Sequence, residues 1–478
     1  MGHASPRASD PGFLWPAVPP PREAQMLAIL WQLERTQWWD PERLRAYQLL
    51  QLSSLLRHAA RTAPAQARRL AGVRDLAPGA LTAEAFAAIP PMGREAAQAA
   101  GEGLRSTAPP AAHGQVGFGS TSGSSGRPMA LARSELDVLT GEALLQRANQ
   151  WFGRDMAWTQ AYVGPAGARG EGRRDAWSRA LPLGAAHVVD VRRPADEVLA
   201  RLDAIRPQLL AIWPSLLAEL IRLRPAPPEG LREVATYGET VSPGLRALCR
   251  ERWGVPLRDG YSAEEVGPIA HECPHGRWHV HAEHVLVEVL DAAGRPCAPG
   301  ETGRVVLSGL HSHAMPMIRM ETGDLATPAA PCPCGRGLPA LARIDGRVRD
   351  LVELADGRRV LPTFDEAALS AAAPGLRRYQ LVRLGPGAVE ARVVVAAPLA
   401  PQERRALAAA FAAGIAPGGA RGDSPGGASG VPPGGASGVP PGGASGIPAR
   451  NLPGLTVEVR EAARLETAAS GKRLATLG

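Results

Sequence analysis

Between residues 160 and 260, short apolar runs alternate with stretches of helical periodicity, and this alternation constrains the fold more than any other feature of the chain. The apolar runs lie at 186–191, 209–213 and 234–237, and the helical stretches lie at 195–205, 216–223 and 243–252. Such alternation is typical of βαβ units, in which helices cover a parallel sheet. We therefore expect an α/β domain in this region.

The rest of the chain predicts a second, smaller domain. A chain of 478 residues is too long for one simple core. Residues 24–72 have the apolar spacing of helices, residues 278–310 are strand-like, and a small α+β pattern follows Asp345-Gly346. We expect three parts, namely a disordered tail at 1–23, a large α/β domain at 24–347 and a small α+β domain at 348–478.

A low-complexity segment interrupts the C-terminal domain. Residues 425–448 are three near-identical octapeptides rich in Pro, Gly and Ser, within a biased stretch at 417–449. This composition supplies too few apolar side chains to form a core, so we expect a disordered loop.

The charge of the chain does not point to nucleic acid. The net charge is +7, but the basic residues are almost all arginine and are spread along the chain without a long basic block. No apolar run is long enough to span a membrane, and no secretory signal pattern is present, so we expect a cytoplasmic protein. Its oligomeric state stays open. Lys472 is the single lysine and is a candidate for a role that arginine cannot fill.

A loop at residues 117–128 concentrates glycines and hydroxyl side chains between apolar flanks. Glycines let the backbone approach a ligand closely, and hydroxyl and N–H groups can then surround phosphate oxygens. The loop lacks the G-x-x-x-x-G-K-[ST] pattern of a P-loop. A flexible Ser/Gly linker is the alternative interpretation of this composition.

Four further motifs follow the loop in order. Each combines a turn with carboxylates, aromatic residues or arginines, and they lie at 237–240, 259–267, 319–324 and 343–350. Alone, each motif is consistent with an ordinary turn or a solvated surface. Their order along one chain is far more specific.

Five cysteines, an odd number in a large chain, argue against a disulfide framework. Cys332 and Cys334 form a C-x-C pair, and Cys273 is followed closely by His275 and His279. Three thiolates and one imidazole would make a closed tetrahedral zinc site.

With the loop and the four motifs, the chain resembles the adenylate-forming superfamily, and within it the phenylacetate–CoA ligase-like branch. The resemblance covers most of the chain and is strongest at 117–362 and again at 470–473. It implies a large N-terminal α/β domain, a small mobile α+β C-terminal lid domain and an active site between them.

The resemblance also assigns an ATP site. Gly238 and Glu239 would flank the adenine, and Tyr261 would stack on it. Asp324 would accept hydrogen bonds from the ribose hydroxyls, and Arg347 would lie near the ribose and phosphates. The loop residues that would surround the β- and γ-phosphates are Ser120, Thr121, Ser122, Gly123, Ser124, Ser125 and Gly126.

Two residues would act on the reacting charges. Glu265 is similar to the carboxylate that holds Mg²⁺ in the family. Lys472 matches the catalytic lysine of the family's C-terminal S-G-K motif, which holds the α-phosphate and the substrate carboxylate. Glu264 departs from the family pattern, in which Ser or Thr usually precedes the metal carboxylate, and would add negative charge beside the phosphates.

The resemblance implies that a carboxylate attacks the α-phosphate of ATP, that pyrophosphate leaves, and that a thiol, most often coenzyme A, then takes the acyl group from acyl-AMP. An amine or a carrier protein as acceptor, and a non-catalytic nucleotide- or zinc-binding relative, are the alternatives. Trp213-Pro214-Ser215 lies where relatives build part of the acyl pocket, which favours an aromatic or other compact acid, although a core tryptophan is an equal alternative.

The same branch often carries cysteines at the positions of Cys273, Cys332 and Cys334. The resemblance makes His279 the better-matched fourth ligand of a structural zinc ion, with His275 as the alternative.

Overall fold

The computed structural model describes residues 6, 8–9, 16–77, 79–120, 129–167, 170–178, 180–181, 184–415, 454–463, 465 and 476–477. The chain divides into two compact units. Within the described residues, the first contains residues up to Val241 and Cys249–Arg349, and the second contains Ser242–Leu248 and the residues from Asp350 onward. The predicted repeat at 417–449 lies outside the described residues.

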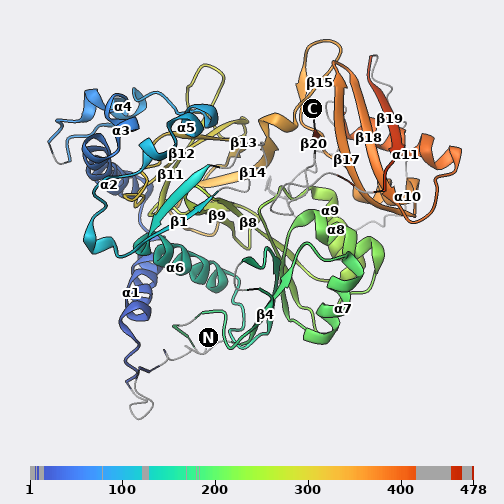
Figure 1. Cartoon of the computed structure of the whole chain (residues 1–478), viewed down its shortest axis with the longest axis horizontal. Helices are drawn as coiled ribbons and strands as arrows, with labels where there is room; N and C mark the ends of the chain where they lie inside the picture. Colours follow the sequence, from blue (N-terminus) through green and yellow to red (C-terminus); the bar gives the residue numbers. More distant parts are fainter. Residues whose placement is uncertain are drawn as a thin grey trace, which may run out of the picture. The chain divides into compact units, whose positions relative to one another are not determined.

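A 12-stranded sheet, in the order β11-β12-β13-β14-β10-β9-β8-β7-β6-β3-β5-β4, forms the centre of the first unit (Figure 1). One half is the predicted α/β region. Its parallel strands are β3 (Gln160–Gly164), β5 (Ala186–Asp190), β6 (Leu209–Ile212), β7 (Glu233–Tyr237) and β8 (Leu257–Ala263). The short antiparallel strand β4 (Gly172–Arg174) lies at its edge.

Burial explains why the strands of this half appear in the sequence as short apolar runs. Every residue of β6 is buried. The strand lies between helices α7 (Ala195–Ile205) and α8 (Pro214–Leu223) in the chain, as expected for βαβ units. A strand covered on both faces needs apolar residues throughout. The mixed α/β fold predicted from the alternation is confirmed.

The other half of the sheet is antiparallel. It consists of β9 (Gly267–Glu272), β10 (Trp278–Val280), β11 (Val285–Leu290), β12 (Gly303–Gly309), β13 (Met320–Pro328) and β14 (Ala340–Arg347). Here β11 and β12 form the hairpin that the strand-like pattern predicts. Strand β8 joins the halves, because it pairs in parallel with β7 and antiparallel with β9.

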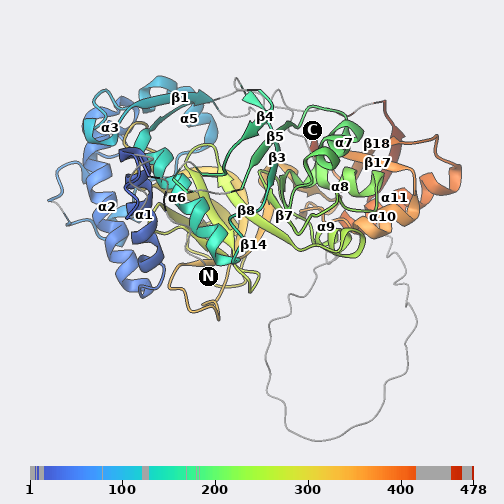
Figure 2. The same cartoon turned by 90° about the horizontal axis from the view of Figure 1, so that it is seen from below.

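Helices of the N-terminal part of the chain pack beside the sheet and against one another. Helices α1 (Pro21–Thr36) and α6 (Glu135–Trp151) lie side by side (Figure 2). Helix α1 begins slightly before residue 24, the expected start of the domain. The remaining helices of this part are α2 (Pro41–Thr62), α3 (Pro64–Ala67), α4 (Ala83–Ala87) and α5 (Arg94–Ala100). Asp40 caps α2 by accepting a hydrogen bond from the Arg43 N–H at 2.8 Å.

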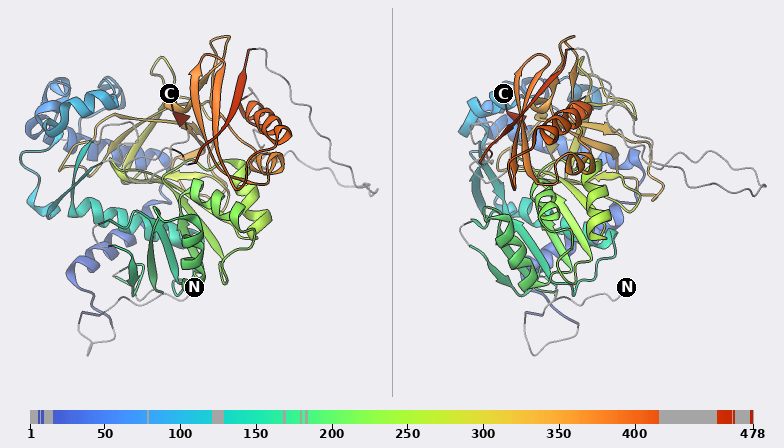
Figure 3. Two further views of the ribbon diagram at one scale, coloured as in Figure 1. Left: turned by 45° about the vertical axis from the view of Figure 1, so that its right-hand side comes forward. Right: turned by 90° about the vertical axis from the view of Figure 1, so that its right-hand side faces the viewer.

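The second unit is built on a four-stranded sheet in the order β19-β18-β17-β20. Its strands are β17 (Leu376–Gly385), β18 (Ala388–Val395), β19 (Thr456–Glu461) and β20 (Thr476–Leu477), and a small pair is formed by β15 (Val352–Glu353) and β16 (Arg359–Val360). Helices α10 (Glu366–Ala372) and α11 (Pro401–Ile415) pack together beside this sheet (Figure 3). Leu407 and Phe411 of α11 are fully buried.

The helical stretch predicted at 243–252 changes character at its centre. Residues Pro243–Leu248 form α9, which is assigned to the second unit, and Cys249–Trp253 continue as a π-helical turn of the first unit. The sequence pattern predicts one helix and gives no sign of this change.

Candidate active site

The glycine- and hydroxyl-rich loop joins two strands of a hairpin. Strand β1 (Val116–Ser120) pairs antiparallel with β2 (Ala130–Ser134), and Ser120 lies opposite Ala130 where the loop begins. Ser120 is exposed at this end. The other predicted phosphate-binding residues, Thr121 to Gly126, lie outside the described residues.

Three of the predicted ATP-site residues meet in one hydrogen-bonded group. The Tyr261 hydroxyl on β8 donates to Asp324 Oδ2 on β13 at 2.7 Å, and Arg347 Nε on β14 lies 3.2 Å from Asp324 Oδ1. The position of Arg347 follows from register, because Asp324 and Arg347 are direct partners across β13 and β14. Burial, and then the adjacent Asp324 carboxylate, raise the pKa of Tyr261 well above its ordinary value.

Glu265, the predicted magnesium ligand, lies close to this group. Its side chain is only 9% exposed and pairs with Arg94 Nη1 at 3.4 Å. Burial raises the pKa of Glu265, and the charge of Asp324 raises it further, whereas Arg94 and Arg347 oppose the shift. A carboxylate held among these charges is suited to bind a cation.

Arg94 is a site residue that the sequence analysis does not identify. It is the first residue of α5, and the preceding segment is fixed against β13 on both sides. The Met92 N–H donates to the Arg319 carbonyl at 2.7 Å, and the Glu321 N–H donates to the Met92 carbonyl at 2.9 Å. The helix break before Met92 is the only local signal, and it does not predict a contact 171 residues away.

Glu264 is exposed, and Arg133 lies beside its carboxylate. Its side chain is 63% exposed and lies 3.6 Å from Arg133 on β2, which also donates to the Glu264 carbonyl. The extra negative charge expected from this departure is therefore paired with an arginine of the β1–β2 hairpin rather than added to the group around Glu265.

Gly238 and Glu239, which are predicted to flank the adenine, follow β7 and lie close to residues that follow β6. Gly238 has φ of 76°, and a side chain there would lie 3.3 Å from Trp213 Nε1, so glycine is favoured on both counts. Glu239 Oε2 accepts a hydrogen bond from the Ser215 N–H at 2.9 Å. Glu239 Oε1 is buried and has no hydrogen-bond partner among the residues that the structure describes.

Tyr237, the first residue of the 237–240 motif, stacks against Tyr162, which the sequence analysis did not single out. The rings of Tyr162 on β3 and Tyr237 on β7 are stacked, with centroids 5.2 Å apart, and the Tyr237 hydroxyl donates to the Val163 carbonyl at 2.9 Å. A Cβ at Gly164 would lie 2.4 Å from the Tyr237 hydroxyl, so only glycine fits there. Together with Trp213 these rings make the strand ends strongly aromatic.

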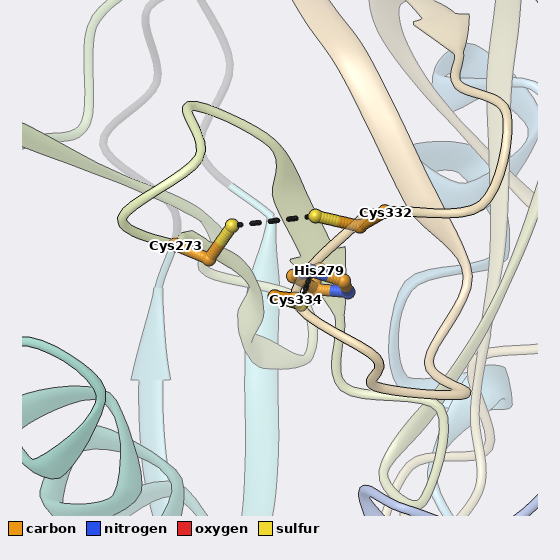
Figure 4. Close-up of side chains that lie close together, drawn as sticks. All are labelled: Cys273, His279, Cys332 and Cys334. Carbon is orange, nitrogen blue, oxygen red and sulfur yellow. Dashed lines mark hydrogen bonds between the residues drawn. The ribbon is translucent and has the colours of Figure 1, made fainter.

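A separate cluster gathers the four predicted zinc ligands (Figure 4). The ligand atoms of Cys273, His279, Cys332 and Cys334 all lie within 4.8 Å of one another. Cys334 Sγ lies 3.1 Å from His279 Nε2, and Cys273 Sγ lies 3.7 Å from Cys332 Sγ. His275 is exposed and is not part of the cluster.

The chemistry of these donors fits a metal ion. His279 Nδ1 lies 3.2 Å from the Leu338 carbonyl and donates to it, which leaves Nε2 as the lone-pair nitrogen facing the thiols. Burial lowers the pKa of His279 to about 4, so the imidazole is neutral, as a ligand must be. Burial raises the pKa of the Cys334 thiol, but hydrogen bonds from Arg336 outweigh burial and leave the pKa below its ordinary value.

Lys472 lies outside the described residues, which resume at β20. Strand β20 pairs in parallel with β17, with Thr476 opposite Leu381. No helix among the described residues is long and apolar enough to cross a lipid bilayer.

No protein-family model matches the chain. The chain is 34% identical over 192 residues to a phenylacetate-coenzyme A ligase of Thermus thermophilus, covering 38% of this chain and 43% of that protein. It is 26% identical over 256 residues to a phenylacetate-coenzyme A ligase of Aromatoleum evansii, covering 51% of this chain and 57% of that protein. The chain thus spans about half the length of the curated relatives that it matches.

Solved structures share the fold. A 2-hydroxyisobutyryl-CoA ligase in the postadenylation state, in complex with R3-HIB-AMP, superposes with a TM-score of 0.63 at 19% identity over 90% of this chain and 88% of that chain. The same ligase in complex with 2-HIB-AMP and CoA gives a TM-score of 0.54 at 20% identity over 93% and 91%. The predicted similarity to phenylacetate–CoA ligases is thus found over part of the chain, and the fold predicted from that resemblance is confirmed over most of it.

Proposed function

We propose that the protein is an AMP-forming acid–thiol ligase, which converts a carboxylic acid and ATP to acyl-AMP and pyrophosphate and then passes the acyl group to a thiol, coenzyme A. The observation that supports this most strongly is the contact of the buried Tyr261 and Asp324 with the half-buried Arg347, from three strands, beside Glu265. The sequence matches to phenylacetate-coenzyme A ligases support the same reaction class.

The residues of the nucleotide site would divide the work as follows. The aromatic ring of Tyr261 would form a wall for the adenine, while its hydroxyl holds Asp324 ready to accept hydrogen bonds from the ribose. Arg347 would hold the Asp324 carboxylate in place and face the phosphates. Glu265 would hold Mg²⁺, which neutralises phosphate charge and orients the pyrophosphate leaving group.

Arg94 would balance the Glu265 carboxylate before Mg²⁺–ATP binds. A buried carboxylate without a counter-ion is costly, and the 3.4 Å contact supplies one. Mg²⁺ held by Glu265 would supply the positive charge that Arg94 supplies to this carboxylate in the structure.

The first step needs no general base, since a carboxylic acid is ionised near neutral pH. Lys472 would neutralise charge on the α-phosphate and the substrate carboxylate as the bond forms. The C-terminal domain would act as the mobile lid that the resemblance implies and would admit the thiol after adenylation.

The acid is proposed to be aromatic or compact. Trp213 directly follows β6, Tyr237 ends β7, and Tyr162 at the centre of β3 stacks on Tyr237; planar rings pack well against aromatic side chains. The four-residue cluster is proposed to hold a structural Zn²⁺, because three thiols and one imidazole with its lone pair directed inward match a closed tetrahedral site.

ATP–pyrophosphate exchange tests this proposal. We expect exchange in the presence of one class of carboxylic acid in a panel, and loss of exchange in Lys472→Ala. Release of AMP with coenzyme A, but not with an amine or a carrier protein, would identify the acceptor. Binding of ATP without exchange for any acid would contradict the proposal and favour a non-catalytic nucleotide-binding relative.

A further inference from the structure

A chain of hydrogen bonds crosses the interior of the first unit and ends at His271. Arg147 on α6 is fully buried, and its guanidinium lies 2.7 Å from Glu283 Oε1 and 2.8 Å from His281 Nδ1. His281 Nε2 in turn lies 2.7 Å from His271 Nδ1. Arg147 and His281 each have a partner on both sides in this series of hydrogen bonds, whereas His271 has one only at Nδ1.

These contacts determine where the protons lie. Arginine only donates, so His281 Nδ1 must accept, and His281 is neutral with its proton on Nε2. That Nε2–H donates to His271 Nδ1, which must therefore be an acceptor as well. The neutral His271 ring consequently carries its proton on Nε2. The last atom of this hydrogen-bonded series, His271 Nε2, is therefore an N–H donor.

The donor lies beside the candidate active site. Tyr237, Gly260 and His271 are direct partners across β7, β8 and β9, so their side-chain positions share one face of the sheet. Gly260 has no side chain, and the His271 ring leans over it, with Nε2 only 3.1 Å from where a Cβ would stand. Tyr237 is one of the two stacked tyrosines of the candidate site, whereas Tyr261, which follows Gly260 on β8, points to the opposite face of the sheet.

Within the described part of the chain, no residue accepts a hydrogen bond from His271 Nε2. A donor fixed in this way, next to an aromatic surface, discriminates among ligands, because a ligand that cannot accept leaves the donor unpaired.

We propose that His271 Nε2–H is a specificity-determining donor of the acyl site, and that it selects carboxylic acids carrying a hydrogen-bond acceptor, such as a hydroxyl, methoxy or carbonyl oxygen, over the parent hydrocarbon acids. This inference rests on the proposed acid-activating function. The discrimination is on the order of tenfold or more in kcat/KM, the usual consequence of leaving a buried donor unpaired.

The variant Gly260→Ala tests this, because its new methyl group would lie 3.1 Å from both Cδ2 and Nε2 of His271 and would crowd the donor from β8. Exchange is measured with pairs of aromatic acids that differ only in one ring acceptor. We expect the wild-type protein to prefer the acceptor-bearing acid of at least one pair, and Gly260→Ala to lose that preference while binding AMP normally. Gly103→Ala is the matched control, since its methyl group meets Ala65 Cβ at 3.3 Å.

Two further outcomes keep the inference separable from the proposed function. Exchange with an unchanged preference in Gly260→Ala overturns the inference alone, and no exchange with any acid overturns the proposed function and the inference together. Independently of activity, histidine ¹⁵N–¹H NMR of the wild-type protein should show both His271 and His281 protonated on Nε2. Protonation of His271 on Nδ1 would overturn the inference even if acids are activated.

Discussion

Replacing Tyr261 by phenylalanine isolates one hydrogen bond of the nucleotide site. The ring is buried at 8% exposure, and the substitution keeps its volume, so no cavity forms. What is lost is a hydrogen bond of 2.7 Å to a carboxylate. Hydrogen bonds to charged groups contribute about 1.5–3 kcal/mol. Because Arg347 remains on the other oxygen of Asp324, we expect the lower part of this range, a loss of about 2 kcal/mol in the free energy of unfolding.

Urea unfolding followed by tryptophan fluorescence measures this loss in the first unit, since all ten tryptophans lie before residue 279. Tyr47→Phe is the matched control, because Tyr47 is 52% exposed. Equal stability of the two variants, within about 0.5 kcal/mol, would refute the reasoning.

The same variant should alter the pH dependence of stability. The pKa of Tyr261 is raised in the folded protein, so its contribution is fully present below the unfolded pKa of about 10 and is lost as pH rises towards the folded pKa. Tyr261→Phe should therefore show a smaller loss of stability above about pH 10 than the wild-type protein.

Three other substitutions extend the account. Glu265→Gln should raise the melting temperature of the nucleotide-free protein more at pH 8 than at pH 4.5, because the raised pKa of Glu265 means that its ionised form lowers stability as pH rises. The same variant should abolish Mg²⁺-dependent exchange. The exposed Glu264→Gln should change neither the melting temperature nor the exchange. Cys334→Ser should reduce the zinc measured by mass spectrometry from one ion per chain to a small fraction and lower the melting temperature, whereas Cys297→Ser, outside the cluster, should leave the zinc unchanged. Gly164→Ala should displace the stacked tyrosines and raise the KM for the acid at least tenfold with little change in the KM for ATP, and equal changes in both would contradict the assignment of these rings to the acid.

The sequence predicts the parts of the fold that are governed by local periodicity. The parallel strands around β6 are recognisable because burial on both faces makes them apolar throughout. Tyr261, Asp324 and Arg347 are identified by the order of their motifs, and the strand register explains why they meet. The π-helical turn at Cys249–Trp253 has no such periodic signal.

Residues defined by long-range contacts could not be found in this way. Arg94 gains its role from a partner 171 residues away, and the tautomer of His271 depends on Arg147 through His281. Arg133 balances Glu264 from a different hairpin, 131 residues distant. In each case the residue type is ordinary, and only the packing of separate strands and helices brings it to its partner.

The most direct measurement follows the oxygen atom that attacks the phosphate. An acid labelled with ¹⁸O in its carboxylate is incubated with ATP, Mg²⁺, coenzyme A and the protein, and the nucleotide products are analysed by mass spectrometry. Attack of the carboxylate on the α-phosphate, followed by thiol transfer, places one ¹⁸O atom in AMP. The account expects labelled AMP, unlabelled pyrophosphate and an acyl thioester, all absent with Lys472→Ala. Formation of ADP with label in inorganic phosphate, or no nucleotide product with any acid, would contradict it.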